Sequence, residues 1–198
     1  MCCMSCKENK VPEVVEVPGL YFDHIPAMTP DSTINVFIEI PAGSTAKWEF
    51  DKAHHRLAMD SINGQPRYID YLGYPANYGM IPNTLSPKDQ GGDGDPLDVI
   101  VLGRQLEQVV HECKVLGVLK LKDRGEIDDK LIAVAIDSPM AKFSSLEELE
   151  LNYPRMLDII EIWFTNYKGV DDDGQPLMMS EGYQDRTAAL NLLMMGLE

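Results

Sequence analysis

Three aspartates lie close together near the middle of the chain, in the stretch Gly91-Gly92-Asp93-Gly94-Asp95-Pro96-Leu97-Asp98. Carboxylates at this spacing repel one another, which raises the pKa of at least one of them unless a cation intervenes. Their oxygens are hard ligands, so Mg²⁺ and Mn²⁺ are the ions that such a cluster would hold. The residue types and their spacing therefore indicate a candidate divalent-metal site.

A solvated loop is the main alternative, because acidic residues in turns rich in glycine and proline often have no other role. A calcium loop of the EF-hand type does not fit, since its glycine position would be Asp98 and its closing glutamate position would be Arg104. A second acidic cluster follows at a predicted hairpin, where Asp123 and Asp128 lie near Lys130. Two such clusters in one chain weigh against the solvated-loop interpretation.

The motif Asp93-Gly94-Asp95-Pro96-Leu97-Asp98, preceded by Tyr74-Pro75-Ala76-Asn77-Tyr78-Gly79, resembles the core of the soluble family I inorganic pyrophosphatases. Further motifs follow the order of that family over roughly residues 36–184. The resemblance implies an α+β fold, in which helices pack against a small closed β-barrel of OB-like type. It also implies Mg²⁺-dependent hydrolysis of pyrophosphate to two phosphates, with Mn²⁺ as a substitute ion, and a homo-oligomer that is a hexamer.

The same resemblance implies that most of the carboxylates bind metal ions and that one acts as a base. Asp98 is shared by the first two metal ions, and Asp123 joins Asp128 for the ions that arrive with the substrate. Asp95 is expected to act as the general base for a water held between the ions. The full set of expected metal ligands is Asp93, Asp98, Asp123, Asp128, Glu39 and Glu49.

Cationic and phenolic side chains are expected to meet the phosphate oxygens. By the resemblance, Lys130 and Tyr78 are expected to be catalytic as well as substrate-binding residues. Arg56 is the alternative to Arg67, because the spacing around 61–66 does not match the family cleanly. Tyr167 also fits an ordinary core position at the end of an apolar stripe. The full substrate-binding set is Lys47, Arg67, Tyr78, Lys130, Tyr167 and Lys168.

The alternation of side chains along a strand supports the assignment of two of these lysines to the site, independently of the family resemblance. Lys47 and Glu49 are two residues apart on a predicted strand, so their side chains share one face. The same spacing separates Asp128 from Lys130. Each lysine is therefore expected to point where an acidic neighbour points.

The charge of the chain limits its partners. Its 198 residues carry a formal net charge of −15, which argues against nucleic acid and against an anionic membrane surface, because phosphate-rich partners are bound by excess Lys and Arg. No run approaches the ~20 apolar residues that span a bilayer. An acidic protein can still bind pyrophosphate where metal ions and a few lysines reverse the local field. A non-catalytic divalent-metal or OB-like binding module is the competing function.

Three cysteines, Cys2, Cys3 and Cys6, crowd the start of the chain. Cys3 and Cys6 formally make a C-x-x-C pair, but without a second pair or nearby histidines this is weak evidence for zinc. Lys7 and Glu8 interrupt any apolar segment of a signal peptide. We expect a reduced cytoplasmic protein, and an exported form stays open if the chain begins after a removed signal.

Apolar patterns predict the elements that must position these groups. Residues 73–87 have no period and are rich in Pro, Gly and Asn, so a long functional loop is expected there. Helices are predicted after a capping box within Ser144-Ser145-Leu146-Glu147-Glu148, from Pro154 to a stop at Gly169, and over 185–195. The organisation is an N-terminal arm over 1–20 and one barrel domain over 21–198. Strands are predicted at 34–40, 46–50, 56–60, 98–102, 113–122 and 131–136, and Asn63-Gly64 predicts a turn after the third of them.

Overall fold

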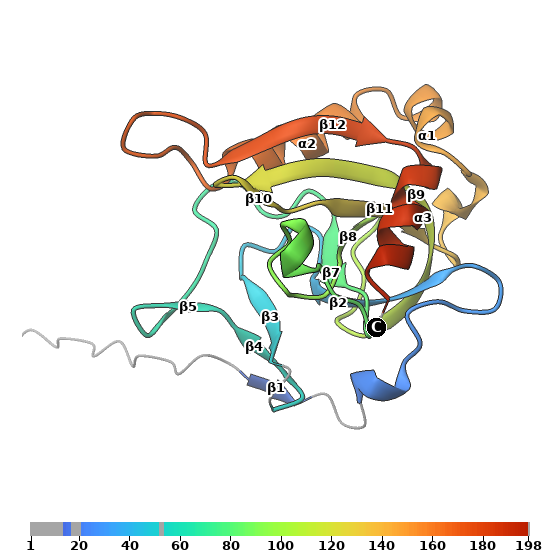
Figure 1. The fold of residues 1–198 in the computed structure, drawn as a ribbon, viewed down its shortest axis with the longest axis horizontal. Coiled ribbons are helices and arrows are strands. Elements are labelled where there is room, and N and C mark those ends of the chain that lie inside the picture. The colour runs from blue at the N-terminus through green and yellow to red at the C-terminus, as the bar shows by residue number, and fades with distance from the viewer. Residues whose placement is uncertain (1–13, 17–20, 52–53, 198) are drawn as a thin grey trace, which may run out of the picture.

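The computed structural model describes residues 14–16, 21–51 and 54–197, and at its centre five strands close into a ring (Figure 1). These strands are β2 (Ile34–Ile40), β7 (Asn77–Met80), β8 (Asp98–Leu102), β9 (Val110–Asp123) and β11 (Lys130–Ala135). β9 pairs with both β11 and β2, and β8 and β7 complete the circle. The β8–β11 pair is parallel, whereas the other pairs of the ring are antiparallel. The predicted closed barrel is confirmed.

Shorter strands extend this ring on two sides. β12 (Met178–Gln184) and β10 (Glu126–Ile127) both pair with β9. A separate three-stranded sheet contains β1 (Val14–Glu16), β4 (Arg56–Met59) and β3 (Trp48–Asp51), in that order. A small hairpin of β5 (Ser61–Ile62) and β6 (Gln65–Pro66) follows β4. Both residues of its turn, Asn63 and Gly64, have positive φ, of 54° and 73°, as the predicted Asn-Gly turn requires.

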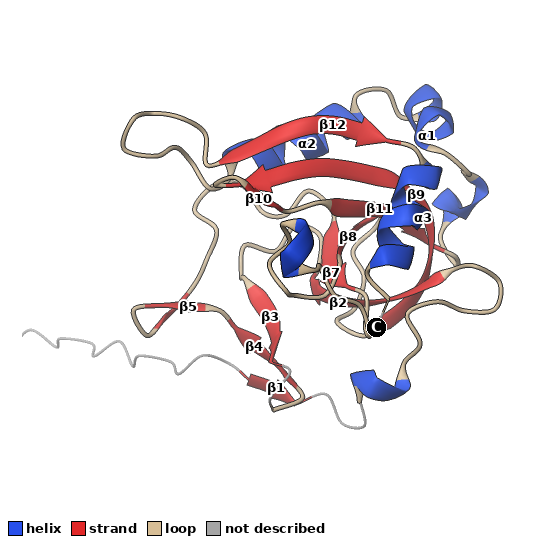
Figure 2. Cartoon of the chain, in the orientation of Figure 1, coloured by secondary structure: helices blue, strands red, loops and turns tan. Residues whose placement is uncertain are grey.

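Three α-helices pack on the sheet (Figure 2): α1 (Leu146–Asn152), α2 (Met156–Asn166) and α3 (Arg186–Met195). Short 3₁₀ helices lie at Phe22–His24, Lys88–Gln90 and Pro139–Lys142. The cap of α1 is present, because Ser145 Oγ accepts from Glu148 N, and Glu148 Oε2 reaches back to accept from Ser144 N, one residue before the cap. Asp185 caps α3 in the same way, by accepting from Ala188 N at 2.9 Å.

Strands β8 and β11 are buried on both faces, which explains why their sequences are continuous apolar runs. Val99 of β8 packs in a cluster that contains Ala189 of α3. Its neighbour Ile100 belongs to a second cluster, which contains Trp163 of α2. Successive side chains of a strand point to opposite faces, so α2 and α3 cover different faces of the sheet.

Several local expectations were wrong. The expected loop over 73–87 contains β7, and β12 was not predicted at all. Helix α2 begins at Met156, after Arg155 in a left-handed conformation, and not at Pro154. Within the expected arm, Val14–Glu16 pairs with β4, whereas the three N-terminal cysteines lie outside the described residues. No helix within the described ranges is long and apolar enough to cross a membrane.

Candidate active site

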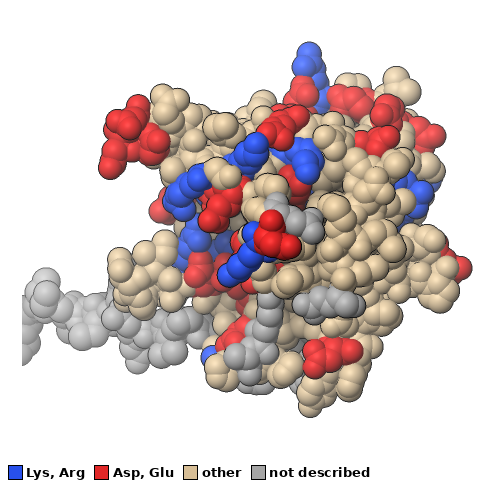
Figure 3. All heavy atoms as spheres, in the orientation of Figure 1, with Lys and Arg blue, Asp and Glu red and all other residues tan. Residues whose placement is uncertain are grey.

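One cavity, of about 310 Å³, brings together all the residues predicted to do chemistry. Figure 3 shows acidic and basic side chains intermingled on the face that carries this hollow. Phe50, Met80 and Pro96 add an apolar wall that the sequence analysis did not anticipate. The predicted residues in the lining are Glu39, Lys47, Glu49, Arg67, Tyr78, Asp93, Asp95, Asp98, Asp123, Asp128, Lys130, Tyr167 and Lys168.

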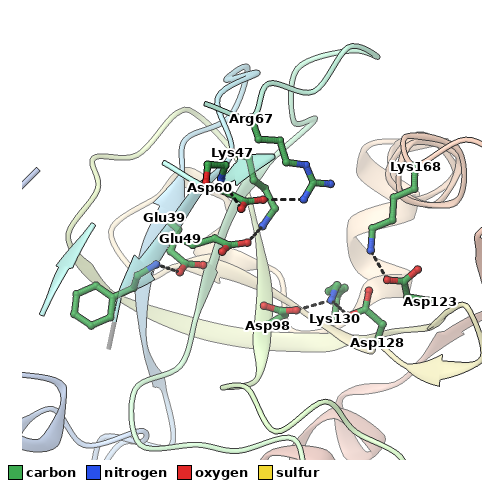
Figure 4. Close-up of polar contacts among 12 residues, drawn as sticks. Glu39, Lys47, Glu49, Asp60, Arg67, Asp98, Asp123, Asp128, Lys130 and Lys168 are labelled. Atoms are coloured by element: carbon green, nitrogen blue, oxygen red, sulfur yellow. Dashed lines mark hydrogen bonds and ion pairs between the residues drawn. The ribbon is translucent and has the colours of Figure 1, made fainter. Parts of the chain in front are cut away.

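The parallel pairing of β8 with β11 builds the centre of the site. Asp98 and Lys130 are the first residues of these strands and are register partners. The Nζ atom of Lys130 lies 2.5 Å from Asp98 Oδ2 and 2.5 Å from Asp128 Oδ1 (Figure 4). Lys130 is only 3% exposed. A single buried ammonium group therefore holds two expected metal ligands together.

Asp98, Lys130 and Asp128 form a charged trio. Opposing effects set the pKa values of Lys130 and Asp128 within it. Burial by itself would lower the pKa of Lys130, but the carboxylates of Asp98 and Asp128 outweigh burial and raise the pKa above its ordinary value. Burial also raises the pKa of Asp128, and the charge of Lys130 offsets part of that rise. Lys130 consequently stays positively charged at neutral pH.

A tight hairpin carries the second acidic cluster. Arg124 and Gly125 have φ values of 49° and 92° at its tip, and positive φ at both turn residues is typical of a type I′ turn. The turn folds the chain back so that Asp123 and Asp128 both line the cavity. The predicted hairpin thus brings its two aspartates to the same site as the Asp93–Asp98 motif.

Asp123 has one paired oxygen and one unpaired oxygen. Lys168 Nζ lies 2.7 Å from Oδ2 of Asp123 (Figure 4). The other oxygen, Oδ1, is buried and has no hydrogen-bond partner among the described residues. An unsatisfied buried acceptor costs about 1–3 kcal/mol, so a cation bound beside Oδ1 would remove an unfavourable feature.

The wall opposite these aspartates carries two more cations. Lys47 Nζ lies 2.8 Å from Glu49 Oε1, so the two side chains share a face as predicted. The backbone N–H of Lys47 donates to the carbonyl oxygen of Arg67 at 3.1 Å, which places the arginine beside the lysine. The guanidinium of Arg67 is held by Asp60, with an Nη1–Oδ2 distance of 2.9 Å. Figure 4 shows this group facing Asp98 across the site.

The structure separates the two candidate arginines. Arg67 lines the cavity, whereas Arg56 pairs with Asp51 at 3.3 Å and does not appear in the lining. Asp60, which orients Arg67, was missed in the sequence analysis. A signal for it existed: a two-residue turn at 63–64 places residues 60 and 67 opposite each other in the hairpin, and Arg67 N indeed donates to Asp60 O at 2.8 Å.

Glu39 is the most deeply buried carboxylate of the set, with an exposed fraction of 8%. It accepts a hydrogen bond from Phe50 N at 2.8 Å. Burial nevertheless raises the pKa of Glu39 to about 8. A nearby cation would favour the ionised form, so the state of this residue depends on what the cavity holds.

Two tyrosines present phenolic groups to the cavity from the core. Tyr78 is 9% exposed and its ring lies 5.8 Å from Lys130 Nζ. Tyr167 stacks on Trp163, with ring centroids 4.5 Å apart. Burial raises the pKa of both phenols, which keeps them protonated as hydrogen-bond donors. Tyr167 therefore packs in the core and also lines the cavity, so both interpretations of its position in the sequence apply.

The donor set fits a hard divalent cation. Seven carboxylates and four cationic side chains line the cavity, so its nominal charge is negative and an anionic ligand would need added positive charge. All the acidic donors are oxygens, which suit Mg²⁺ or Mn²⁺. Within the described ranges, no three acidic, histidine or cysteine side chains already form a metal cluster. Three of the carboxylates are instead paired with Lys130 and Lys168.

A small β-barrel whose cavity is lined by carboxylates and lysines is the arrangement expected of a protein that binds divalent metal ions and phosphate groups. The family model for inorganic pyrophosphatase matches residues 36–198. The chain belongs to the inorganic pyrophosphatase family.

Individual relatives agree with this assignment. The chain is 38% identical over 162 residues to an inorganic pyrophosphatase of Halalkalibacterium halodurans, covering 81% of this chain and 90% of that protein. It is 33% identical over 172 residues to the mitochondrial inorganic pyrophosphatase of Saccharomyces cerevisiae, covering 76% of this chain but only 56% of the yeast protein. It therefore spans little more than half the length of that relative. The solved inorganic pyrophosphatase from Helicobacter pylori aligns with a TM-score of 0.73 at 29% identity, covering 88% of this chain and 96% of that one.

Proposed function

We propose that the protein hydrolyses inorganic pyrophosphate to two phosphates in the cavity described above. The observation that carries this proposal is the meeting, in one cavity, of seven carboxylates with four cationic side chains. Membership of the inorganic pyrophosphatase family supports it. A non-catalytic metal-binding module would need the carboxylates alone, so the lysines and the arginine disfavour that alternative.

Hydrolysis of pyrophosphate is slow without a catalyst because the phosphate oxygens repel an attacking hydroxide. Bound divalent ions would neutralise those oxygens and lower the pKa of a water molecule. The carboxylates proposed to hold these ions are Asp93, Asp98 and Asp128, joined by Asp123, Glu39 and Glu49. Each of them lines the cavity, and the unpaired Oδ1 of Asp123 is a further acceptor there.

Asp95 is the proposed general base. Its backbone N–H donates to Asp93 Oδ1 at 2.9 Å, which ties the base to an adjacent proposed ligand. Its carboxylate would accept a proton from the attacking water as the new P–O bond forms and the bridging P–O bond to the leaving phosphate breaks. The proton would then leave with a phosphate product.

The cationic side chains would stabilise the charge that develops on the phosphate oxygens. Arg67 can present two N–H groups to one phosphate, a geometry that a lysine does not offer. Lys47, Lys130 and Lys168 would act as point charges, and the hydroxyl groups of Tyr78 and Tyr167 would donate hydrogen bonds. In the described structure all four cations are held by carboxylates. The partners of the three lysines are themselves proposed metal ligands, so binding of metal and substrate would exchange the partners of these lysines.

Mg²⁺ is the proposed metal, with Mn²⁺ as a substitute, because the donor set consists of carboxylate oxygens. Ca²⁺ should support hydrolysis poorly or inhibit it, since it forms longer bonds and acidifies bound water less. A homo-oligomer, a hexamer by family resemblance, and a cytoplasmic location stay predictions.

Two isosteric substitutions test the proposed roles. Asp95→Asn removes the proton acceptor and should lower turnover by roughly 10²–10⁴, with no recovery at raised Mg²⁺. Asp98→Asn removes a shared ligand, so raised Mg²⁺ should partly restore its activity. The measurement is the rate of phosphate release against Mg²⁺ concentration for both variants. Recovery of the Asp95 variant by Mg²⁺, without recovery of the Asp98 variant, would mean that the two roles are reversed.

A further inference from the structure

Three of the proposed metal ligands, Asp93, Asp123 and Asp128, come from two separate segments whose spacing has to be maintained. One is the Asp93 loop, residues 86–95, and the other is the Asp128 hairpin, residues 121–130. Asp98 and Asp128 are held to each other through Lys130. Asp93 and Asp95 precede β8, so the register of the strands does not fix them directly. Another contact must hold the Asp93 loop against the hairpin.

The Asp93 loop is closed on itself by backbone hydrogen bonds. Ser86 N donates to Asp95 O at 2.7 Å, and Gly94 N donates to Ser86 O at 2.9 Å. Gly92 N donates to Pro87 O at 2.9 Å. Gly92 has no room for a side chain, because an added Cβ would lie 2.1 Å from Ser86 Oγ and 2.7 Å from the backbone of Ser86. The loop is therefore one compact unit whose position can be set at a single point.

Ile127 makes contact with the loop at Gly91. The backbone N–H of Ile127 donates to the carbonyl oxygen of Gly91 at 3.0 Å. The side chain lies over the same glycine, since a Cβ added to Gly91 would be 3.3 Å from Ile127 Cδ1. Gly91 has a φ of 89°, which favours glycine. Ile127 directly precedes Asp128, so one residue links the hairpin's ligand to the loop that carries Asp93.

The same isoleucine closes a small space behind the carboxylates. A pocket of about 20 Å³ is lined by Ile127 together with Asp93, Asp98 and Asp128. Shortening the isoleucine would enlarge this space and remove the side-chain contact at Gly91, whereas the backbone hydrogen bond from Ile127 to Gly91 would remain. The loop would then be held less firmly against the hairpin. The side chain of Ile127 therefore lies where it can set the distance between the Asp93 loop and the Asp128 hairpin.

We infer that Ile127 is a positioning residue, which fixes the Asp93 loop against the Asp128 hairpin and so sets the affinity of the site for divalent metal. The inference rests on the proposed metal-dependent function. Ile127 itself presents no polar side-chain atom to metal or substrate. Its effect would pass through the positions of Asp93 and Asp128. Mutation of the outer partners that orient metal ligands typically changes metal affinity 10–100-fold, and we expect a residue that positions two ligand segments to act on that scale.

The test compares Ile127→Ala and Ile127→Val with the control Ile136→Ala. Ile136 follows the far end of β11 and is 44% exposed, about 20 Å along the chain from Lys130 at the rise of a strand. Mn²⁺ binding to the purified, substrate-free protein is measured by titration calorimetry. The Mg²⁺ concentration at half-maximal phosphate release is measured in parallel. We expect Ile127→Ala to weaken Mn²⁺ binding roughly tenfold or more, Ile127→Val to weaken it by a smaller but measurable factor, and Ile136→Ala to leave it unchanged.

Each outcome decides the inference. Wild-type affinity in a folded Ile127→Ala protein would overturn it, as would an equal loss in Ile136→Ala. Should Ile127→Ala fail to fold, Ile127→Val decides, because it removes the Cδ1 atom nearest to Gly91; unchanged Mn²⁺ affinity would then refute the positioning role. Failure of the proposed function looks different, since the wild-type protein itself would then release no phosphate.

Discussion

Replacing Lys130 by methionine is the most informative single perturbation of this site. Methionine keeps most of the side-chain length and the apolar contacts but removes the ammonium group. In the metal-free protein this leaves Asp98 and Asp128, each 2.5 Å from the lost nitrogen, without their shared cation. Their side chains are only 26% and 17% exposed, so water compensates poorly. The variant should therefore be less stable in the absence of metal.

The expected size follows from the burial of the trio. Removing one partner of a buried ion pair destabilises a protein by about 3–5 kcal/mol. For a chain of this size that corresponds to a melting temperature lower by roughly 6–20 °C. Lys122→Met is the matched control, because Lys122 pairs with Glu181 at an exposed site with side chains 38% and 53% exposed. Surface pairs contribute about 0–1 kcal/mol, so the control should melt near the wild type.

The pH dependence has a definite sign. Burial and the charge of Asp98 raise the pKa of Asp128, and Lys130 offsets part of that rise, so without Lys130 the folded-state pKa of Asp128 lies further above the unfolded value of about 3.9. Asp128 then binds its proton more readily in the folded protein, so the destabilisation is absent below the unfolded pKa. It grows as the pH rises and is complete above the folded pKa. The wild type and the Lys130→Met variant should therefore melt closest together in acid and farthest apart at pH 8.

The assay is thermal unfolding in chelator at several pH values, repeated with excess Mg²⁺. A bound divalent ion supplies the missing charge, so Mg²⁺ should raise the melting temperature of Lys130→Met by more than it raises that of the wild type. Equal melting temperatures of wild type and variant in chelator at pH 8 would refute the electrostatic account of the trio. A gap that stays constant with pH would show that the loss comes from packing instead.

Three further outcomes are expected. Gly79→Ala should destabilise the fold by at least about 3 kcal/mol, measured by denaturant unfolding, because an added Cβ would lie 2.0 Å from the backbone oxygen of Phe37; wild-type stability would contradict the packing of β7 on β2. Arg67→Lys should raise KM for pyrophosphate roughly tenfold, the effect of losing one charge-assisted hydrogen bond, whereas Arg56→Ala should leave KM unchanged; the reverse pattern would transfer the role to Arg56. Burial raises the pKa of Glu39 to about 8, so the metal-free wild type should lose stability as this carboxyl ionises between pH 5 and pH 9. Glu39→Gln has no such group and should become more stable relative to the wild type over that range. A difference in unfolding free energy that stays constant with pH would argue against the raised pKa.

Elements with a strong local pattern could be predicted from the sequence. The strand at 34–40 coincides with β2, and 98–102 coincides with β8. The cap at Ser145 and the Asn-Gly turn at 63–64 are local signals that involve few neighbours, and both are present. Such signals are readable because their hydrogen bonds connect residues close in the chain.

Strands that depend on distant partners were not predictable in the same way. β7 (Asn77–Met80) lies in a segment rich in turn residues and is extended because β2 and β8 flank it. β12 (Met178–Gln184) includes Gly182 and has a register irregularity against β9, which removes the clean alternation of a strand. In both cases tertiary pairing outweighs local propensity.

The members of the candidate site were predictable from motifs, but their contacts were not. Every predicted residue lines one cavity. The Asp98–Lys130–Asp128 trio depends on the parallel register of β8 and β11, which no local pattern in either strand encodes. The role of Asp60 beside Arg67 follows from the turn at 63–64, and only the structure made that link evident.

The most direct test of the central claim is phosphate release by the purified protein from pyrophosphate, in excess Mg²⁺ and again after exhaustive chelation. The account predicts two phosphates released per pyrophosphate consumed with Mg²⁺ present, loss of release in chelator, and recovery when Mg²⁺ is restored. No phosphate release by the folded protein in Mg²⁺, or full release in chelator, would contradict a metal-dependent pyrophosphatase.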